Sequence, residues 1–157
     1  MIVLVMGVSG SGKTTIGERV AQRLGWRFIE GDDYHPRKNV EKMAAGVPLD
    51  DADRQPWLEA INKALLSEQD AVLACSALKD RYRATLFAGI RDFRIAYLHG
   101  SRELLARRVA GRKHRYMPAS LLDSQLATLE PPREAIALDV SAGVDECVEA
   151  IVREVAA

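Results

Sequence analysis

The amino-acid sequence predicts an α/β fold in which a mostly parallel sheet is covered by helices on both faces. The first observation is an apolar run at 2–6 that leads directly into a glycine-rich segment and then into a helical pattern. The second is that further short apolar runs alternate with helical stretches along the rest of the chain. The 157 residues contain no repeat or linker, so we expect a single domain over 1–157.

The predicted strands are short runs of apolar residues, at 2–6, 26–29, 71–75, 93–98 and 135–140. The first helix opens at 13 and repeats Ile16, Val20 and Leu24 at four-residue intervals, with Gly25 as its stop signal. A short helix is expected at 38–45, inside a polar stretch. The next helix covers 54–66, with Asp53 as its N-cap. The remaining helices are predicted at 104–109, 121–129 and 144–155.

The glycine-rich segment fits the P-loop pattern G-x-x-x-x-G-K-[ST]. Its glycines allow backbone N–H groups to turn inward around a phosphate, and the following helix points its positive end at the same anion. Lys13 then reaches the β- and γ-phosphates of ATP, and the hydroxyl of Thr14 can ligate Mg²⁺. The alternative is a glycine-rich turn without a ligand. The predicted nucleotide-binding residues are Gly7, Val8, Ser9, Gly10, Ser11, Gly12, Lys13, Thr14 and Thr15.

Composition argues against several other classes of protein. The 22 basic and 22 acidic side chains cancel, so no net charge favours nucleic acid or an anionic membrane. The apolar start is too short to span a bilayer. Cys75 and Cys147 do not make a disulfide framework, and Cys75 is expected to be a buried small apolar residue. We therefore expect a cytoplasmic protein with no nucleic-acid or membrane partner.

A P-loop by itself indicates a nucleotide and leaves the reaction open. Switch GTPases need a guanine-reading N-K-x-D motif, whereas Asn62-Lys63 is followed by Ala64 inside a predicted helix, which argues against that class. A phosphotransferase needs a group that orients or deprotonates the acceptor hydroxyl.

Acidic residues follow the second predicted strand, at the edge of the sheet where ligands bind. Asp32 is the predicted acceptor ligand and general base, with a solvated carboxylate as the alternative. For Asp33, a solvated loop carboxylate is favoured over a role in the site. Glu30 either supports the metal through water or faces solvent.

Two groups of cations accompany these acidic residues. The first surrounds the predicted mouth of the site and suits an acidic acceptor, although any single member can equally be a surface charge: His35, Arg37, Arg54, Lys79, Arg81 and Arg83. The second runs through a helix into a loop: Arg102, Arg107, Arg108, Arg112, Lys113, His114 and Arg115. We interpret this second group as a lid over about 111–118, in which Arg112 contacts ATP and the transferring phosphoryl group. A solvated face and a nucleic-acid patch remain alternatives.

Several segments together resemble the small gluconate kinases, P-loop enzymes related to nucleoside-monophosphate and shikimate kinases. The matching segments cover nearly the whole chain: 6–14, 31–36, 42–49, 53–58, 75–83 and 121–132. The P-loop is common to many families, whereas the His-Pro, Pro-Trp-Leu and Cys-Ser-Ala-Leu-Lys segments are far more specific. One departure lies at 114–118, where relatives often carry Gly-His-Phe-Met-Pro and this chain has His-Arg-Tyr-Met-Pro, which leaves the roles of His114 and Arg115 open.

The resemblance implies a five-stranded parallel sheet with flanking helices and a mobile lid. It also implies ATP-dependent phosphorylation of D-gluconate on its 6-hydroxyl, for sugar-acid catabolism, and a homodimer. By matching segment, Lys13 is the phosphate lysine and Asp32 the acceptor-hydroxyl residue, within an acceptor-binding segment at about 31–58. The resemblance places the following residues on segments that line the sugar-acid pocket: His35, Arg54, Ser76, Lys79, Arg83 and Gln125.

Two other functions remain open from the sequence. One is a P-loop kinase for another small anionic acceptor, such as shikimate or a nucleoside monophosphate. The other is a non-catalytic, nucleotide-dependent RNA-binding protein that uses the basic run. Substrate-dependent release of ADP identifies a kinase, whereas salt-sensitive RNA binding without turnover supports the RNA-binding protein.

Overall fold

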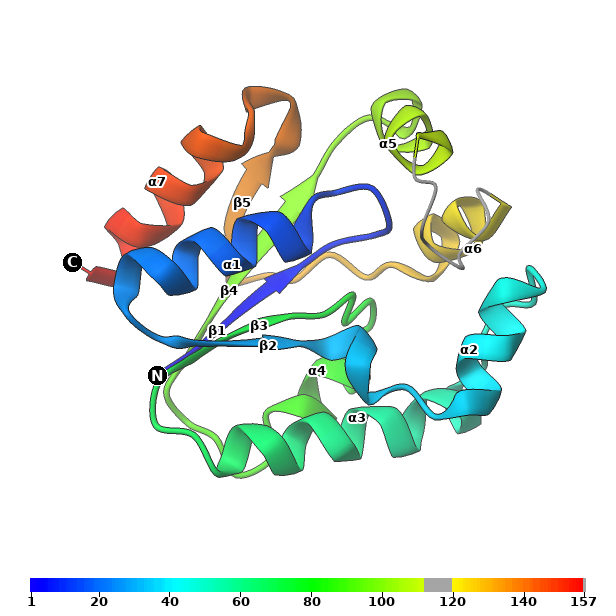
Figure 1. Cartoon of the computed structure of the whole chain (residues 1–157), viewed down its shortest axis with the longest axis horizontal. Coiled ribbons are helices and arrows are strands. Elements are labelled where there is room, and N and C mark those ends of the chain that lie inside the picture. The colour runs from blue at the N-terminus through cyan, green and yellow to red at the C-terminus, as the bar shows by residue number, and fades with distance from the viewer. Residues whose placement is uncertain (112–119, 157) are drawn as a thin grey trace.

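The computed structural model describes residues 1–111 and 120–156. Its centre is a five-stranded sheet in which every neighbouring pair is parallel, in the order β2-β3-β1-β4-β5 (Figure 1). The strands are β1 (Ile2–Met6), β2 (Arg27–Glu30), β3 (Ala71–Ala74), β4 (Phe93–His99) and β5 (Ile136–Asp139). Each lies within one or two residues of a predicted strand, and the predicted fold class is confirmed.

Strand β1 forms the middle of the sheet and of the hydrophobic core. Val3 pairs with Val72 of β3 on one side and with Arg94 of β4 on the other. All five residues of β1 are buried, because both faces of the sheet are covered at this point. A strand that is covered on both faces requires an unbroken apolar run, and this run is why the strand could be predicted from the sequence.

Helices cover the two faces of the sheet, as Figure 1 shows. Helices α1 (Lys13–Leu24) and α7 (Val144–Ala156) pack together on one face, while α3 (Asp51–Leu66) and α4 (Asp80–Leu86) pack together on the other. Three further helices lie near the carboxyl ends of the strands: α2 (Arg37–Ala44), α5 (Arg102–Ala110) and α6 (Ser120–Thr128). Short 3₁₀ turns follow two strands, η1 (Gly31–Tyr34) after β2 and η2 (Val140–Ala142) after β5.

The structure corrects one sequence prediction and adds one helix that was not predicted. Helix α3 begins at Asp51 with Asp50 as its N-cap, so the prediction of Asp53 as N-cap was wrong. Asp53 instead occupies the third helical position, where the two carboxylates form a reciprocal capping box: Asp53 N–H donates to Asp50 over 2.7 Å and Asp50 N–H donates to Asp53 over 3.1 Å. Helix α4 was not predicted, because its seven residues show too little periodicity to be recognised.

The two cysteines are free and buried, as expected for Cys75. Burial raises the pKa of the Cys75 thiol to about 12, so this side chain stays a neutral thiol at physiological pH. No helix in the described part of the chain is both long and apolar enough to cross a lipid bilayer.

Candidate active site

The candidate site lies beyond the carboxyl ends of the parallel strands, where three loops or turns and one helix meet. They are the P-loop after β1, η1 after β2, the loop 75–79 after β3 and helix α6. Ligands of open parallel α/β sheets bind at this edge, because the strand ends and helix N-termini converge there. The sequence-based expectation about which segments approach one another agrees with this arrangement.

The P-loop has the backbone that its glycines permit. Gly10 has a φ of +86°, and a Cβ at this position would come within 2.8 Å of the Leu105 carbonyl oxygen of α5. The turn is closed by Ser11, whose hydroxyl donates to the Val8 carbonyl oxygen over 2.7 Å. Ser9 N–H donates to Gln125 Oε1 over 2.7 Å, which ties the loop to helix α6. The loop is therefore held in shape from inside and from a neighbouring helix.

The side chains at the start of α1 contact the P-loop and the end of β2. Lys13 Nζ lies 3.4 Å from the Val8 carbonyl oxygen, so the lysine folds back over the loop. The Thr14 hydroxyl donates to the Glu30 carboxylate, and burial raises the pKa of Glu30 above its usual range. A hydroxyl beside a carboxylate is a pair of hard oxygen donors, which suits Mg²⁺. Thr15, the next residue of α1, is exposed.

A cavity opens beside the P-loop, and most of the predicted pocket residues line it. Among the predicted residues, the cavity is lined by Ser9, Lys13, Asp32, His35, Arg54, Ser76 and Gln125. Its other lining residues were not predicted as site residues: Met43, Pro48, Leu49, Trp57, Leu78, Leu121 and Ser124. Several of these lie in the segments that carry the family resemblance, so position in a motif was the signal available for them.

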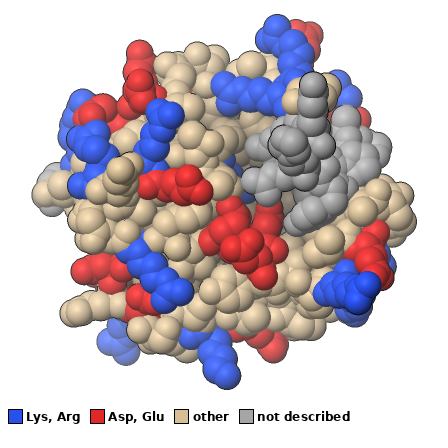
Figure 2. Space-filling model, viewed as in Figure 1, with Lys and Arg blue, Asp and Glu red and all other residues tan. Residues whose placement is uncertain are grey.

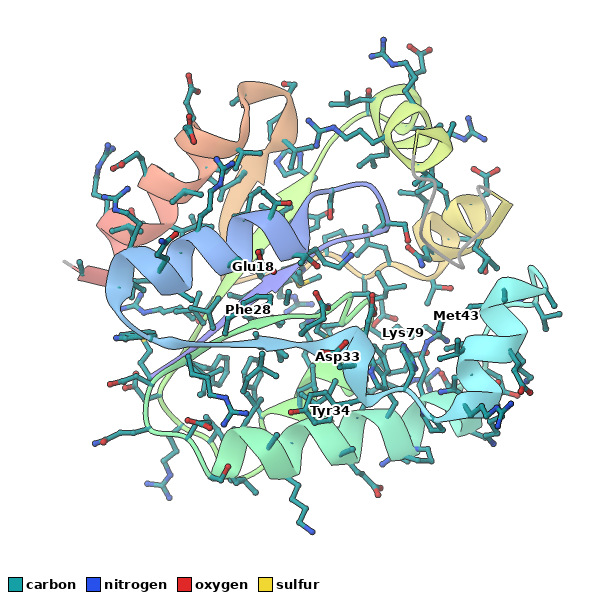
Figure 3. All side chains as sticks on the ribbon, in the orientation of Figure 1. Glu18, Phe28, Asp33, Tyr34, Met43 and Lys79 are labelled. Carbon is teal, nitrogen blue, oxygen red and sulfur yellow. The ribbon has the colours of Figure 1, made fainter. Side chains whose placement is uncertain are left out.

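The two neighbouring aspartates of η1 occupy different surroundings. Asp32 lines the cavity, and its N–H donates to Glu30 Oε1 over 3.2 Å, which fixes the start of the turn. Asp33 is exposed on the same turn (Figure 3). Figure 2 shows acidic side chains gathered near the centre of the face that is turned to the viewer. In Figure 1 the turn that follows β2 lies in this region. The geometry therefore favours Asp32 over Asp33 as the group that meets an acceptor.

His35 contributes a neutral ring to the cavity, so its inclusion among the cations of the mouth was wrong. Its ring stacks on Trp57 with centroids 4.0 Å apart and planes 13° from parallel. Burial lowers the pKa of His35 to about 4; Asp32 opposes this shift and Arg54 adds to it. His35 is consequently uncharged at physiological pH.

Arg54 is a cation of the cavity wall that is held in place by its neighbours. Its Nη1 donates to the Leu49 carbonyl oxygen over 2.7 Å and to the Tyr82 hydroxyl over 3.0 Å. The guanidinium carbon also lies 5.2 Å from the centre of the Tyr82 ring. Tyr82 is anchored in turn, because its hydroxyl donates to Asp51 at the start of α3. This leaves Arg54 presented to the cavity in a defined position.

Arg83 does not lie in the cavity, which contradicts its assignment as a pocket residue. It is only 5% exposed, and its guanidinium donates to the Ala77 carbonyl oxygen over 2.6 Å, to the Glu130 carbonyl oxygen over 2.8 Å and to the Asp80 carboxylate. Because α4 begins at Asp80, residue 83 points back under the loop that precedes the helix. Arg83 is part of the support of the site.

The other cations expected at the mouth are also placed elsewhere. Lys79 does not line the cavity; its Nζ lies 5.9 Å from the centre of the Tyr82 ring. Arg37 pairs with Glu41 within α2, and Arg81 pairs with Asp51. Among the described residues, Lys13 and Arg54 are the cations of the cavity wall. Of the six residues expected to supply positive charge at the mouth, Arg54 is therefore the one that does so in the described cavity wall.

Glu130 joins two walls of the cavity and was not predicted as a functional residue. Its N–H donates to the Leu78 carbonyl oxygen over 2.7 Å, and its carboxylate accepts from Asp80 N–H over 2.9 Å. Together with the bond from Arg83, these contacts fasten the chain after α6 to the loop after β3. The loop itself is strained, because Ala77 has a φ of +45° without being a glycine.

The described part of the basic run also has structural partners. Arg102 makes two bonds to Asp123, over 2.7 and 2.9 Å, which join α5 to α6. Arg108 donates to the carbonyl oxygens of Gly10 and Val140, over 3.4 and 3.1 Å, and so connects the P-loop to the end of β5. The predicted lid residues lie outside the described residues, apart from Gly111: Arg112, Lys113, His114 and Arg115.

Comparison with known proteins gives concordant results for sequence and fold. Residues 2–132 match the AAA domain family. The chain is 46% identical to a probable gluconokinase of Xenopus tropicalis, covering 99% of this chain and 93% of the relative. It is 49% identical to a gluconokinase of Gluconobacter oxydans, covering 83% and 75%. The crystal structure of a gluconokinase from Sinorhizobium meliloti superposes with a TM-score of 0.90 at 45% identity, covering 98% of this chain and 90% of that one.

Proposed function

Because the chain belongs to the gluconokinase family of P-loop kinases, we propose that the cavity beside its P-loop is the D-gluconate site of an ATP-dependent kinase. The enzyme transfers the γ-phosphoryl group of ATP to the 6-hydroxyl of D-gluconate and produces 6-phospho-D-gluconate. The observation that carries the site assignment is that one cavity is lined by the phosphate lysine Lys13, the carboxylate of Asp32 and the fixed cation Arg54.

The nucleotide half of the proposal rests on the P-loop. Backbone N–H groups between Gly7 and Lys13 surround the phosphates, and the N-terminus of α1 adds its positive end. Lys13 neutralises negative charge that spreads over the γ-phosphoryl oxygens in the transition state. Thr14 and Glu30 would hold Mg²⁺, directly or through water. When bound, the metal neutralises phosphate charge that the protein cations leave uncompensated.

The acceptor half uses the residues around η1 and α3. Asp32 orients the 6-hydroxyl and takes its proton as the hydroxyl oxygen bonds to the γ-phosphorus and the bond between that phosphorus and the β–γ bridging oxygen breaks. Arg54 pairs with the carboxylate of the sugar acid, in place of Lys79 and Arg83. His35, Ser76 and Gln125 complete the wall with groups that hydrogen-bond hydroxyls. The acceptor-binding segment is proposed to extend over about 31–58.

Other parts of the proposal come from the family resemblance. Arg112 is proposed to contact ATP from the lid at about 111–118, in a homodimeric, cytoplasmic enzyme with no nucleic-acid or membrane partner. Each of these statements has its own measurement: kinetics of an Arg112→Ala variant, the molar mass in solution and the location of the protein in fractionated cells.

A coupled assay of ADP release tests the substrate assignment directly. The purified enzyme is supplied with ATP, Mg²⁺ and one acceptor at a time, chosen from gluconate, glucose, shikimate and nucleoside monophosphates. We expect gluconate to give the highest kcat/KM, and glucose to be a very poor acceptor because it leaves the arginine without a carboxylate. Equal values for gluconate and glucose would refute an anionic acceptor site, and a preference for shikimate or a nucleotide would reassign it.

A further inference from the structure

Asn39 is a fully buried polar residue beside the acceptor cavity, and sequence analysis did not single it out. It lies on α2, is 0% exposed and does not line the cavity. Its amide nitrogen donates to the Asp53 carbonyl oxygen over 2.9 Å and lies 3.2 Å from Nδ1 of His35. A buried amide placed between a backbone carbonyl and an imidazole defines the hydrogen-bonding roles of both.

These two contacts fix the orientation of the Asn39 amide. If the amide were turned over, its oxygen would face the Asp53 carbonyl oxygen, and two acceptors would meet without a proton between them. The NH₂ group therefore faces both partners and supplies one proton to each. Since an NH₂ group only donates, Nδ1 of His35 has to be the acceptor, and the ring proton of the neutral imidazole resides on Nε2.

The imidazole ring is also held against rotation. It stacks on Trp57, and the Trp57 indole N–H donates to the Gly31 carbonyl oxygen over 2.8 Å, at the start of η1. The charged groups that act on the ring are Asp32 and Arg54, both of which line the same cavity. Because Nδ1 faces Asn39, the Nε2–H is the ring group that remains to hydrogen-bond a ligand in the cavity.

We propose that Asn39 is a positioning residue that keeps His35 in the Nε2–H form, so that His35 donates a hydrogen bond to an oxygen of the sugar acid. This inference rests on the proposed acceptor site and assigns a role within it. His35 is then a specificity-determining donor, and deprotonation of the acceptor hydroxyl is left to Asp32. The donor is constant across the physiological pH range, because the ring neither gains nor loses a proton there.

The first test reads the ring of the wild-type enzyme without any substrate. In ¹⁵N-labelled protein, the NMR shifts of the two ring nitrogens distinguish an N–H nitrogen from a bare one. We expect His35 to show a protonated Nε2 and a bare Nδ1 at neutral pH. A protonated Nδ1, or a charged ring at pH 7, would overturn the inference. This reading is independent of turnover, so a failure of the proposed substrate would be seen separately, as missing activity with gluconate.

The second test changes Asn39 and uses a matched control. Asn39→Asp puts a carboxylate against Nδ1, which should draw the ring proton to Nδ1 and leave Nε2 without one, and Asn39→Ala removes the donor that holds the proton on Nε2. We expect each to raise the KM for gluconate about tenfold, the usual effect of losing one hydrogen bond, with little change in the KM for ATP. Asn62→Asp is the control, because the amide of Asn62 likewise bonds two acceptors, here the carbonyl oxygens of Leu86 and Ala88, away from the cavity.

The outcomes separate positioning from general destabilisation. An increase in the gluconate KM in both Asn39 variants and not in Asn62→Asp supports the inference. Equal increases in both KM values, or the same behaviour in the Asn62 control, would reduce Asn39 to a structural residue and overturn it.

Discussion

Arg54 provides the sharpest test of how the cavity recognises an acid. The proposed perturbation is Arg54→Met, which keeps an unbranched side chain and removes the charge. A hydrogen bond to a charged group contributes about 1.5–3 kcal/mol, so loss of the pair with the gluconate carboxylate should lower kcat/KM for gluconate about 10- to 150-fold. The variant also loses the bonds to Leu49 and Tyr82, and this structural effect has to be separated from the loss of recognition.

A cycle of two enzymes and two substrates makes that separation. Glucose has no carboxylate, so its poor phosphorylation should respond only to the structural part of the change, whereas gluconate responds to both parts. The assay is kcat/KM from coupled ADP release for wild type and Arg54→Met with each sugar. We expect the ratio of kcat/KM for gluconate to kcat/KM for glucose to fall about 10- to 150-fold in Arg54→Met. Arg81→Met is the control, because Arg81 lies 5.8 Å from the same Tyr82 ring and does not line the cavity.

The reasoning would be refuted by an equal loss of kcat/KM for the two sugars in Arg54→Met. The arginine would then act only through its neighbours, and another group would have to bind the carboxylate. An unchanged preference in a variant with normal thermal stability would lead to the same conclusion.

Three further predictions concern the reacting group and the supports of the site. Asp32→Asn should lower kcat about 10²- to 10⁴-fold, the contribution of a positioned general base, while ATP binding measured by calorimetry stays unchanged. Arg83→Met should lower Tm by roughly 5–20 °C in a thermal melt, because the buried carbonyl oxygen of Ala77 and the partly buried one of Glu130 lose their donor; an unchanged Tm would contradict its structural role. Bonds from Lys42 and from Asp50 N–H lower the pKa of Asp53 to about 2. Because this folded-state pKa is depressed, the carboxylate stabilises the fold at neutral pH and this contribution is lost toward pH 2, so the stability gap between wild type and Asp53→Asn, measured by urea unfolding, should narrow as pH falls.

The parts of the fold that were predictable are those whose signals are local. The run of five apolar residues in β1, the P-loop after it and the Gly25 stop of α1 each depend on neighbouring residues. Gly25 has a φ of +71°, the left-handed conformation that ends helices. Helix α4 and the start of α3 were missed for the opposite reason. Seven residues show too little periodicity, and a segment with aspartates at 50, 51 and 53 offers several equivalent caps.

In the site, likewise, the sequence predicted which segments meet but did not predict the directions of several side chains. The expectation of a parallel sheet, together with motif position, was enough to predict which loops meet. Lys13 was found through the P-loop pattern, and Asp32 because it follows the second strand closely. Arg83 was misplaced because the direction of its side chain depends on where α4 begins, and that start was not predicted. His35 was counted as a cation because burial and stacking on Trp57 are tertiary properties.

The contacts that support the cavity hold its described walls in a fixed arrangement. Gln125 accepts from the P-loop at Ser9, and Glu130, a few residues further along the chain, is fastened to the loop after β3. The segment from α6 to 130 therefore connects the phosphate side of the cavity to its acceptor side. Positioned groups contribute to catalysis mainly when their geometry is fixed before the substrate arrives, because no reorganisation is then required during the reaction. Arg83 and Glu130 provide that fixed geometry from outside the cavity, although the sequence had assigned Arg83 to the pocket and had given Glu130 no role.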